Sequence, residues 1–101
     1  MKKLCIALAA LAAGIASAQD NPEVEGKRLF TSGTPACILC HTLRDAGAEG
    51  AIGPSLDELK PDAARVAKAM KTGIGQMPAF SQLSDAQVQA VARYVEAASR
   101  R

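Results

Sequence analysis

The sequence has few of the residues that bind metals or fill the core of a small domain. Its 101 residues include three aromatic side chains, no tryptophan, three cysteines and one histidine. A single histidine excludes any site that needs two imidazoles from the same chain, so bis-histidine ligation of one iron is excluded. The length allows one domain, which excludes a multi-domain enzyme.

The chain also lacks a strong charge of either sign and has no low-complexity segment. Twelve basic and ten acidic residues give a formal net charge of +2, and 22% of the residues are charged. With 49% apolar residues, this is the composition of an ordinary globular protein, and it excludes an intrinsically disordered chain.

Residues 1–18 have the pattern of a secretory signal peptide. Lys2 and Lys3 give a positive start, residues 4–13 form an unbroken apolar run, and the small residues 16–18 favour cleavage after Ala18. The apolar run is shorter than the roughly 20 residues that span a bilayer core, so we expect no membrane anchor. The pattern therefore predicts export and a periplasmic protein.

Removal of this signal leaves a predicted mature domain at residues 19–101 and changes its chemistry. Ten basic residues then face ten acidic ones, so no net positive charge remains to favour nucleic acid as a partner. Cys5 is lost with the signal, because it lies at the start of the apolar run and not after it beside the cleavage site, where a lipid-bearing cysteine would be expected. The pair Cys37 and Cys40 remains. The apolar content of so short a domain is modest, which favours a cofactor, metal or disulfide as additional support.

Apolar periodicity predicts an all-α fold of three to four short helices with no strand pair. We expect them at residues 22–31, 55–59 and 61–72 and from Ser84 onward, with loops at residues 42–54 and 73–83. Capping-box patterns mark two helix starts, Ser55 with Glu58 and Ser84 with Gln87.

The chemistry of the sequence is concentrated in Cys37-Ile38-Leu39-Cys40-His41. Two thiols three residues apart can add to the two vinyl groups of one haem, while the adjacent histidine reaches the iron from the same side. A redox-active Cys-x-x-Cys would favour a βαβ context, and the sequence shows no strands to provide it. A zinc site needs four ligands, so it would need a carboxylate beside these three residues. A plain disulfide would leave His41 without a role. We therefore predict one haem c, covalently bound through Cys37 and Cys40, with His41 as an iron ligand.

The second axial position of such an iron has several candidates: Met70, Met77, a lysine or no ligand. Met70 lies on the apolar stripe of a predicted helix, which is typical of a core side chain. Met77 lies in the loop Gly73-Ile74-Gly75-Gln76-Met77-Pro78-Ala79-Phe80, where glycines let the backbone approach a flat cofactor. The spacing favours Met77 and leaves the alternatives open.

Three motifs, in this order along one small helical domain, resemble the class I monohaem cytochromes c. They are Cys37-Ile38-Leu39-Cys40-His41, Gly53-Pro54-Ser55-Leu56 and Met77-Pro78-Ala79-Phe80. The resemblance covers nearly all of residues 19–101 and implies a fold wrapped around one haem. It implies that the Pro54 carbonyl accepts the N–H of the iron-bound histidine and that Met77 is the distal ligand. It also implies that the first and last helices cross where Gly26, Phe30 and Tyr94 lie.

Residues 42–47 and 57–61 are similar to small cytochromes c that accept electrons from bacterial sulfite dehydrogenases. A histidine and thioether ligand set implies a comparatively high potential and little access for substrates, hence a one-electron carrier and not an enzyme. Its partners would be redox proteins that dock transiently at the haem edge, a donor dehydrogenase and an acceptor cytochrome or oxidase. The alternatives are a permanently bound haem subunit of a dehydrogenase, or a haem enzyme or gas sensor with an open iron if Met77 does not ligate.

Charge is distributed unevenly along the domain. Residues 19–59 carry three basic and seven acidic groups, whereas residues 60–101 carry seven basic and three acidic ones. Arg65, Lys68 and Lys71 share the predicted helix before the Met77 loop. A solvated helix face is the commoner role of such a row, and a docking face for an acidic partner is the alternative.

Overall fold

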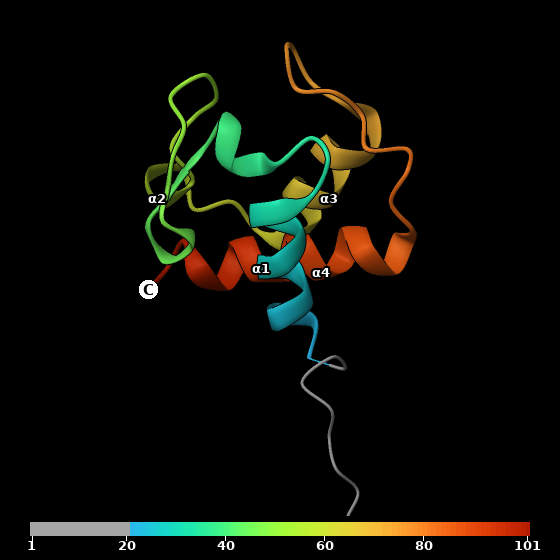
Figure 1. Ribbon diagram of the computed structural model, residues 1–101, viewed down its shortest axis with the longest axis horizontal. Helices are drawn as coiled ribbons and strands as arrows, with labels where there is room; N and C mark the ends of the chain where they lie inside the picture. The colour runs from blue at the N-terminus through green and yellow to red at the C-terminus, as the bar shows by residue number, and fades with distance from the viewer. Residues whose placement is uncertain (1–20) are drawn as a thin grey trace, which may run out of the picture.

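The computed structural model describes residues 21–101, so the predicted signal peptide and its cleavage site lie outside the described residues. Short helices joined by long loops make up the described chain, with the last helix running across the lower part of the fold and α1 crossing it in Figure 1. In chain order the elements are α1 (Pro22–Ser32), η2 (Cys37–Leu39), β1 (Thr42–Leu43), η3 (Arg44–Ala46), β2 (Ala48–Glu49), α2 (Leu56–Leu59), α3 (Ala63–Thr72) and α4 (Asp85–Ala98). The expected small helical fold is thereby confirmed.

The expectation of no strand pair is wrong by one short ladder. β1 and β2 pair antiparallel, Thr42 with Glu49 and Leu43 with Ala48. Gly47 turns the chain between them in the left-handed region, at φ 63°. The pair is only two residues long on each side, too short for the alternation that identifies a strand in a sequence.

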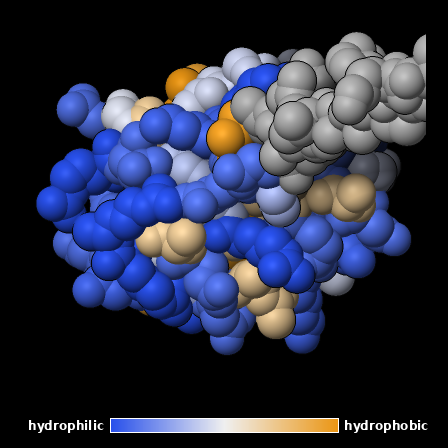
Figure 2. Space-filling model, turned by 90° about the horizontal axis from the view of Figure 1, so that it is seen from below, coloured by the Kyte–Doolittle hydropathy of each residue, from blue (hydrophilic) through white to orange (hydrophobic). Residues whose placement is uncertain are grey.

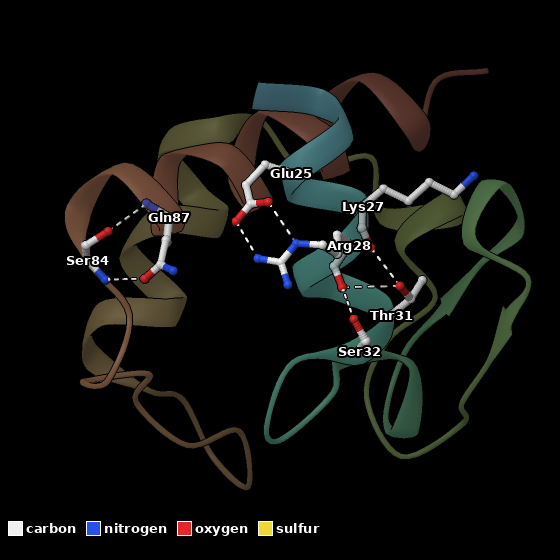
Figure 3. Close-up of polar contacts among 7 residues, drawn as sticks. All are labelled: Glu25, Lys27, Arg28, Thr31, Ser32, Ser84 and Gln87. Carbon is white, nitrogen blue, oxygen red and sulfur yellow. Dashed lines mark hydrogen bonds and ion pairs between the residues drawn. The ribbon is translucent and has the colours of Figure 1, made fainter. Parts of the chain in front are cut away.

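The helix starts are set by side chains that accept backbone N–H groups. Ser84 and Gln87 form both halves of the predicted capping box at α4 (Figure 3). At α2, Ser55 Oγ accepts the N–H of Glu58 at 3.4 Å. α3 begins later than its proline suggested, because the carboxylate of Asp62 accepts the N–H of Arg65 and makes Asp62 the cap.

α1 crosses α4 at a position where a side chain has no room. A Cβ added to Gly26 would lie 2.6 Å from the Cβ of Tyr94 and closer still to the carbonyl oxygen of Ala90. Four residues along α1, the Phe30 ring meets that of Tyr94 edge to face, with centroids 6.0 Å apart. The three residues singled out by the family resemblance therefore lie together between α1 and α4. Figure 1 shows the crossing of these two helices.

The end of α4 and the residues just beyond it fix the junction between α2 and α3. Glu96 Oε2 accepts the N–H of Ala63 at 2.8 Å, and the Arg100 guanidinium donates to the carbonyls of Lys60 and Pro61 at 2.9 and 3.0 Å. These bonds hold the start of α3 at a fixed place on α4.

Several polar side chains of α1 form hydrogen bonds within the helix. Arg28 pairs with Glu25 through two hydrogen bonds, and the hydroxyls of Thr31 and Ser32 donate back to helix carbonyls (Figure 3). Figure 2, which views the molecule from the α4 side, shows a mostly hydrophilic face with scattered apolar side chains. No helix within residues 21–101 is long and apolar enough to cross a bilayer.

Candidate haem-binding site

A cavity of about 490 Å³ opens among η2, α3 and the two loops at residues 50–54 and 74–78. Both loops rise at the end of the molecule away from α4 (Figure 1). The volume lies within the roughly 300–1,000 Å³ of ordinary ligand pockets. Its inner wall is made of core side chains, including Phe30, Met70, Val91 and Val95. The site thus shares its wall with the hydrophobic core.

Every predicted site residue lines this cavity: Cys37, Cys40, His41, Pro54 and Met77. The fold therefore brings together three motifs that are separated by up to 40 positions in sequence. Met70 lines the same cavity but is also part of the core, with 1% of its surface exposed. Both candidate methionines are consequently present at the site, Met70 as a buried core side chain and Met77 on a loop.

The Cys37–His41 segment folds into one tight turn. The N–H groups of Cys40 and His41 both donate to the carbonyl of Cys37, at 3.1 and 3.0 Å. Neither cysteine forms a disulfide. Burial, opposed by a backbone hydrogen bond and assisted by the nearby Cys40, raises the pKa of the Cys37 thiol to about 11. A nucleophilic redox cysteine needs a lowered pKa, so this environment does not favour thiol–disulfide exchange chemistry.

The imidazole of His41 is oriented by the loop that contains Pro54. Nδ1 of His41 lies 2.8 Å from the Pro54 carbonyl oxygen, so Nδ1–H donates and Nε2 is left for a metal. Gly53 lies against the ring, because a Cβ at this position would be 2.6 Å from His41 Cε1. The N–H of Gly53 donates to the Cys40 carbonyl at 2.6 Å and ties this loop to the cysteine turn.

A second tight turn presents Met77. Ile74 and Met77 exchange two backbone hydrogen bonds, at 3.0 and 2.9 Å, around Gly75 with φ 55°. The N–H of Phe80 donates to the Met70 carbonyl at 2.7 Å, which returns the loop to the end of α3. The side chain of Met77 is half-buried and lines the cavity.

The mouth of the cavity carries exposed apolar side chains that the sequence alone did not single out. Four of the five large apolar residues that are exposed within residues 21–101 line it: Leu39, Ile52, Leu59 and Ile74. We call these four residues the apolar rim. They lie in four separate segments of the sequence, so only the folded chain brings them together.

The donor set and the cavity fit a covalently attached haem. Two thiols, an imidazole with its Nε2 unused and a thioether converge on a pocket whose other lining is almost entirely apolar. These are the groups that bind a haem c and fill both axial positions of its iron. Apart from the cysteines, the polar side chains in the lining are His41, Arg65 and Gln76.

Comparison with known proteins agrees with this site. Residues 21–95 match the family described as cytochrome c oxidase, cbb3-type, subunit III. Among solved structures, the chain is similar to the c-type cytochrome SorU from Sinorhizobium meliloti, at 49% identity and a TM-score of 0.76. The match covers 77% of this chain and 91% of SorU. No curated protein sequence gave a match. The chain therefore belongs to the cytochrome c family and is a small class I monohaem cytochrome with a covalently bound haem c.

Proposed function

We propose that this cytochrome is an exported one-electron carrier between a periplasmic dehydrogenase and a later respiratory carrier or oxidase. The observation that carries the proposal is the convergence of His41 and Met77 on one apolar cavity, with the imidazole fixed by the Pro54 carbonyl. Six-coordinate iron of this kind leaves no open position for a substrate, which favours electron transfer over catalysis.

In this proposal each site residue has one role. Cys37 and Cys40 would hold the haem through two thioether bonds, His41 Nε2 and the Met77 sulfur would be the iron ligands, and the bound haem would supply a one-electron Fe(II)/Fe(III) couple. The Nδ1–H bond to Pro54 raises the basicity of His41 and fixes its ring plane. The apolar wall excludes water and disfavours the more highly charged ferric state, which raises the potential.

The apolar rim is the proposed docking surface for redox partners. Leu39, Ile52 and Ile74 are 63, 68 and 69% exposed, and all three border the haem cavity. The row of cations on α3 is less suited to this role, because Lys71 pairs with Asp85 at 3.2 Å and Arg65 belongs to the cavity lining. We therefore expect electron transfer to depend only weakly on ionic strength.

The proposed donor is a sulfite dehydrogenase. The support is the similarity of residues 42–47 and 57–61 to cytochromes that serve such enzymes. In the structure, Asp57 Oδ2 accepts the N–H of Arg44 at 2.9 Å, so the two similar segments are joined. Stopped-flow reduction of the purified cytochrome by a sulfite dehydrogenase, compared with another periplasmic dehydrogenase, tests the donor. Faster reduction by the second enzyme would contradict this assignment.

The ligand set is tested with a matched pair of variants, Met77→Leu and Met70→Leu. Both methionines line the cavity, and leucine conserves most of the volume. Met77→Leu should lose the weak red absorption of sulfur ligation, bind cyanide rapidly and show a lower potential. Met70→Leu should keep the red absorption, the slow cyanide binding and the potential of the unmodified protein. The reverse pattern would assign Met70 as the ligand, and rapid cyanide binding by the unmodified protein would support an open iron instead.

Two measurements on the native protein test its export and its association with other chains. The N-terminus of the protein isolated from the periplasmic fraction should begin at Gln19. In high salt the protein should elute alone, because a carrier that docks transiently does not remain bound. Co-elution with a catalytic chain would instead support a permanently bound haem subunit.

A further inference from the structure

Among the described residues, one cationic side chain lines the haem cavity, and it is neither a haem attachment residue nor a predicted iron ligand. Arg65, in the first turn of α3, is the one lysine or arginine in a lining that also holds no aspartate or glutamate. The side chain is exposed at the cavity edge, and its guanidinium forms no ion pair with any acidic group of residues 21–101.

A bound haem would also need partners for its propionate carboxylates, which the two predicted iron ligands do not provide. A haem ring has two propionate carboxylates on the half opposite its vinyl groups, and Cys37 and Cys40 would hold the vinyl half. A carboxylate next to apolar walls needs a hydrogen-bonding or charged partner. The planar guanidinium of arginine matches a carboxylate with two parallel N–H bonds.

The backbone at the start of α3 is poorly placed to supply that partner. The Asp62 carboxylate accepts the N–H of Arg65 at 2.8 Å, and the Asp62 carbonyl accepts the N–H of Val66 at 3.1 Å. Glu96 Oε2 accepts the N–H of Ala63 at 2.8 Å. Most of the N–H groups that could bind an anion at this terminus therefore already have acceptors, and the nearby carboxylates are engaged. The guanidinium of Arg65 remains for the ligand.

We propose that Arg65 is a positioning residue that binds a propionate carboxylate of the haem and thereby raises the reduction potential. The proposal rests on haem occupying this cavity, as the proposed function requires. A propionate charge favours the ferric state of the iron, and a cation bound to that carboxylate offsets this effect. Arg65 thus belongs to the haem site, and it is not available as part of a docking row with Lys68 and Lys71.

The test compares the reduction potentials of the holoprotein and the variants Arg65→Gln, Arg65→Lys and Lys68→Gln. Lys68 is exposed on the same helix and does not line the cavity, so it controls for the loss of one surface charge. At a fixed ambient potential we expect Arg65→Gln to lower the Fe(II)/Fe(III) ratio about fivefold, because the loss of one partly screened positive charge beside the propionate favours the ferric state. Arg65→Lys should restore most of the ratio, and Lys68→Gln should change it little.

Two outcomes would overturn the proposal. In the first, Arg65→Gln shifts the potential no more than Lys68→Gln does. In the second, Arg65→Lys is as low as Arg65→Gln, which would show that the charge is not responsible. The red absorption band distinguishes a failure of this proposal from a failure of the proposed function. That band should persist in all three variants, whereas its absence from the unmodified protein would contradict Met77 ligation and leave the Arg65 comparison intact.

Discussion

The imidazole of His41 is held between a carbonyl oxygen and a glycine backbone. Pro54 accepts its Nδ1–H at 2.8 Å, and Gly53 leaves just enough space for the ring. The hydrogen bond fixes the rotation of the ring about its own axis, and the glycine allows the loop to approach it. Together they keep Nε2 directed to one position, which is what a fixed metal ligand requires.

We predict that Gly53→Ala displaces His41 and destabilises the holoprotein. The added Cβ would lie 2.6 Å from His41 Cε1 and 2.9 Å from Nδ1, closer than atoms of these types approach. Such overpacking typically costs about 1–3 kcal/mol. Urea unfolding monitored at the haem absorption band measures the loss.

The matched control for this substitution is Gly47→Ala. Gly47 has a positive φ of 63° with open space around its Cβ position, so alanine there costs backbone strain of about 1–2 kcal/mol without a clash. Gly53→Ala should shift the haem spectrum as well as the urea midpoint, and Gly47→Ala only the midpoint. An unchanged haem spectrum in Gly53→Ala would mean that the ring does not depend on this glycine.

Asp45 connects the segment after His41 to both long helices. It lies in η3, accepts the hydroxyl of Tyr94 from α4 at 2.6 Å, and lies 3.7 Å from the ammonium of Lys27 in α1. Arg101, beyond the end of α4, reaches Asp45 at 3.4 Å and also pairs with Glu23. One carboxylate therefore ties three elements and the C-terminus together.

We predict that Tyr94→Phe lowers the free energy of unfolding by about 1.5–3 kcal/mol, the usual range for a hydrogen bond to a charged group. Burial, and then the hydrogen bond to Asp45, raise the pKa of the Tyr94 hydroxyl well above its ordinary value of 10.0. The unfolded chain therefore ionises first, and the stabilisation by Tyr94 is full below about pH 10 and declines above it.

Urea titrations at pH 8 and at pH 11 measure this effect. The difference between the unmodified protein and Tyr94→Phe should be larger at pH 8 and smaller at pH 11. Lys27→Gln, which removes an exposed ion pair to the same carboxylate, should cost less than about 1 kcal/mol. An equal cost for the two variants at pH 8 would argue against the Tyr94 bond as the main link.

The whole molecule has a core that is completed by its cofactor. Phe30, Met70, Val91 and Val95 belong to the buried cluster and also face the cavity of about 490 Å³. Without a haem, these side chains would border space that neither water nor protein fills favourably. The stability of so small a domain therefore depends on the group it binds.

We predict that Cys37→Ala combined with Cys40→Ala accumulates poorly and unfolds without a cooperative transition, because the haem is no longer retained. Near-ultraviolet circular dichroism and urea unfolding measure the fixed tertiary structure. Met77→Leu, which should keep both thioether bonds, is the control and should unfold cooperatively. A haem-free double variant that unfolds as sharply as the holoprotein would contradict a core completed by haem.

The local features of this molecule were readable from the sequence because a few neighbouring residues determine them. The Cys37–His41 motif, the helices and the Ser84–Gln87 capping box all depend on contacts within about four positions. The sequence does not indicate the two-residue ladder, and it predicts a start of α3 that is too early. The ladder has no measurable period, and the cap at Asp62 competes with the helix signal of Pro61. The signal peptide stays a prediction.

The tertiary structure determined which side chains from distant segments of the sequence meet at the cavity. Met70 and Met77 both border the cavity, and only the fold shows one as a core side chain and the other on a loop turn. The uneven distribution of charge between residues 19–59 and 60–101 does not show that Arg65 lines the cavity or that Lys71 pairs with Asp85. The sequence by itself determined the cofactor and its covalent attachment, because adjacent residues carry that chemistry. Loop closure and helix packing determined the walls, the rim and the charge at the haem edge, because those depend on contacts across tens of residues.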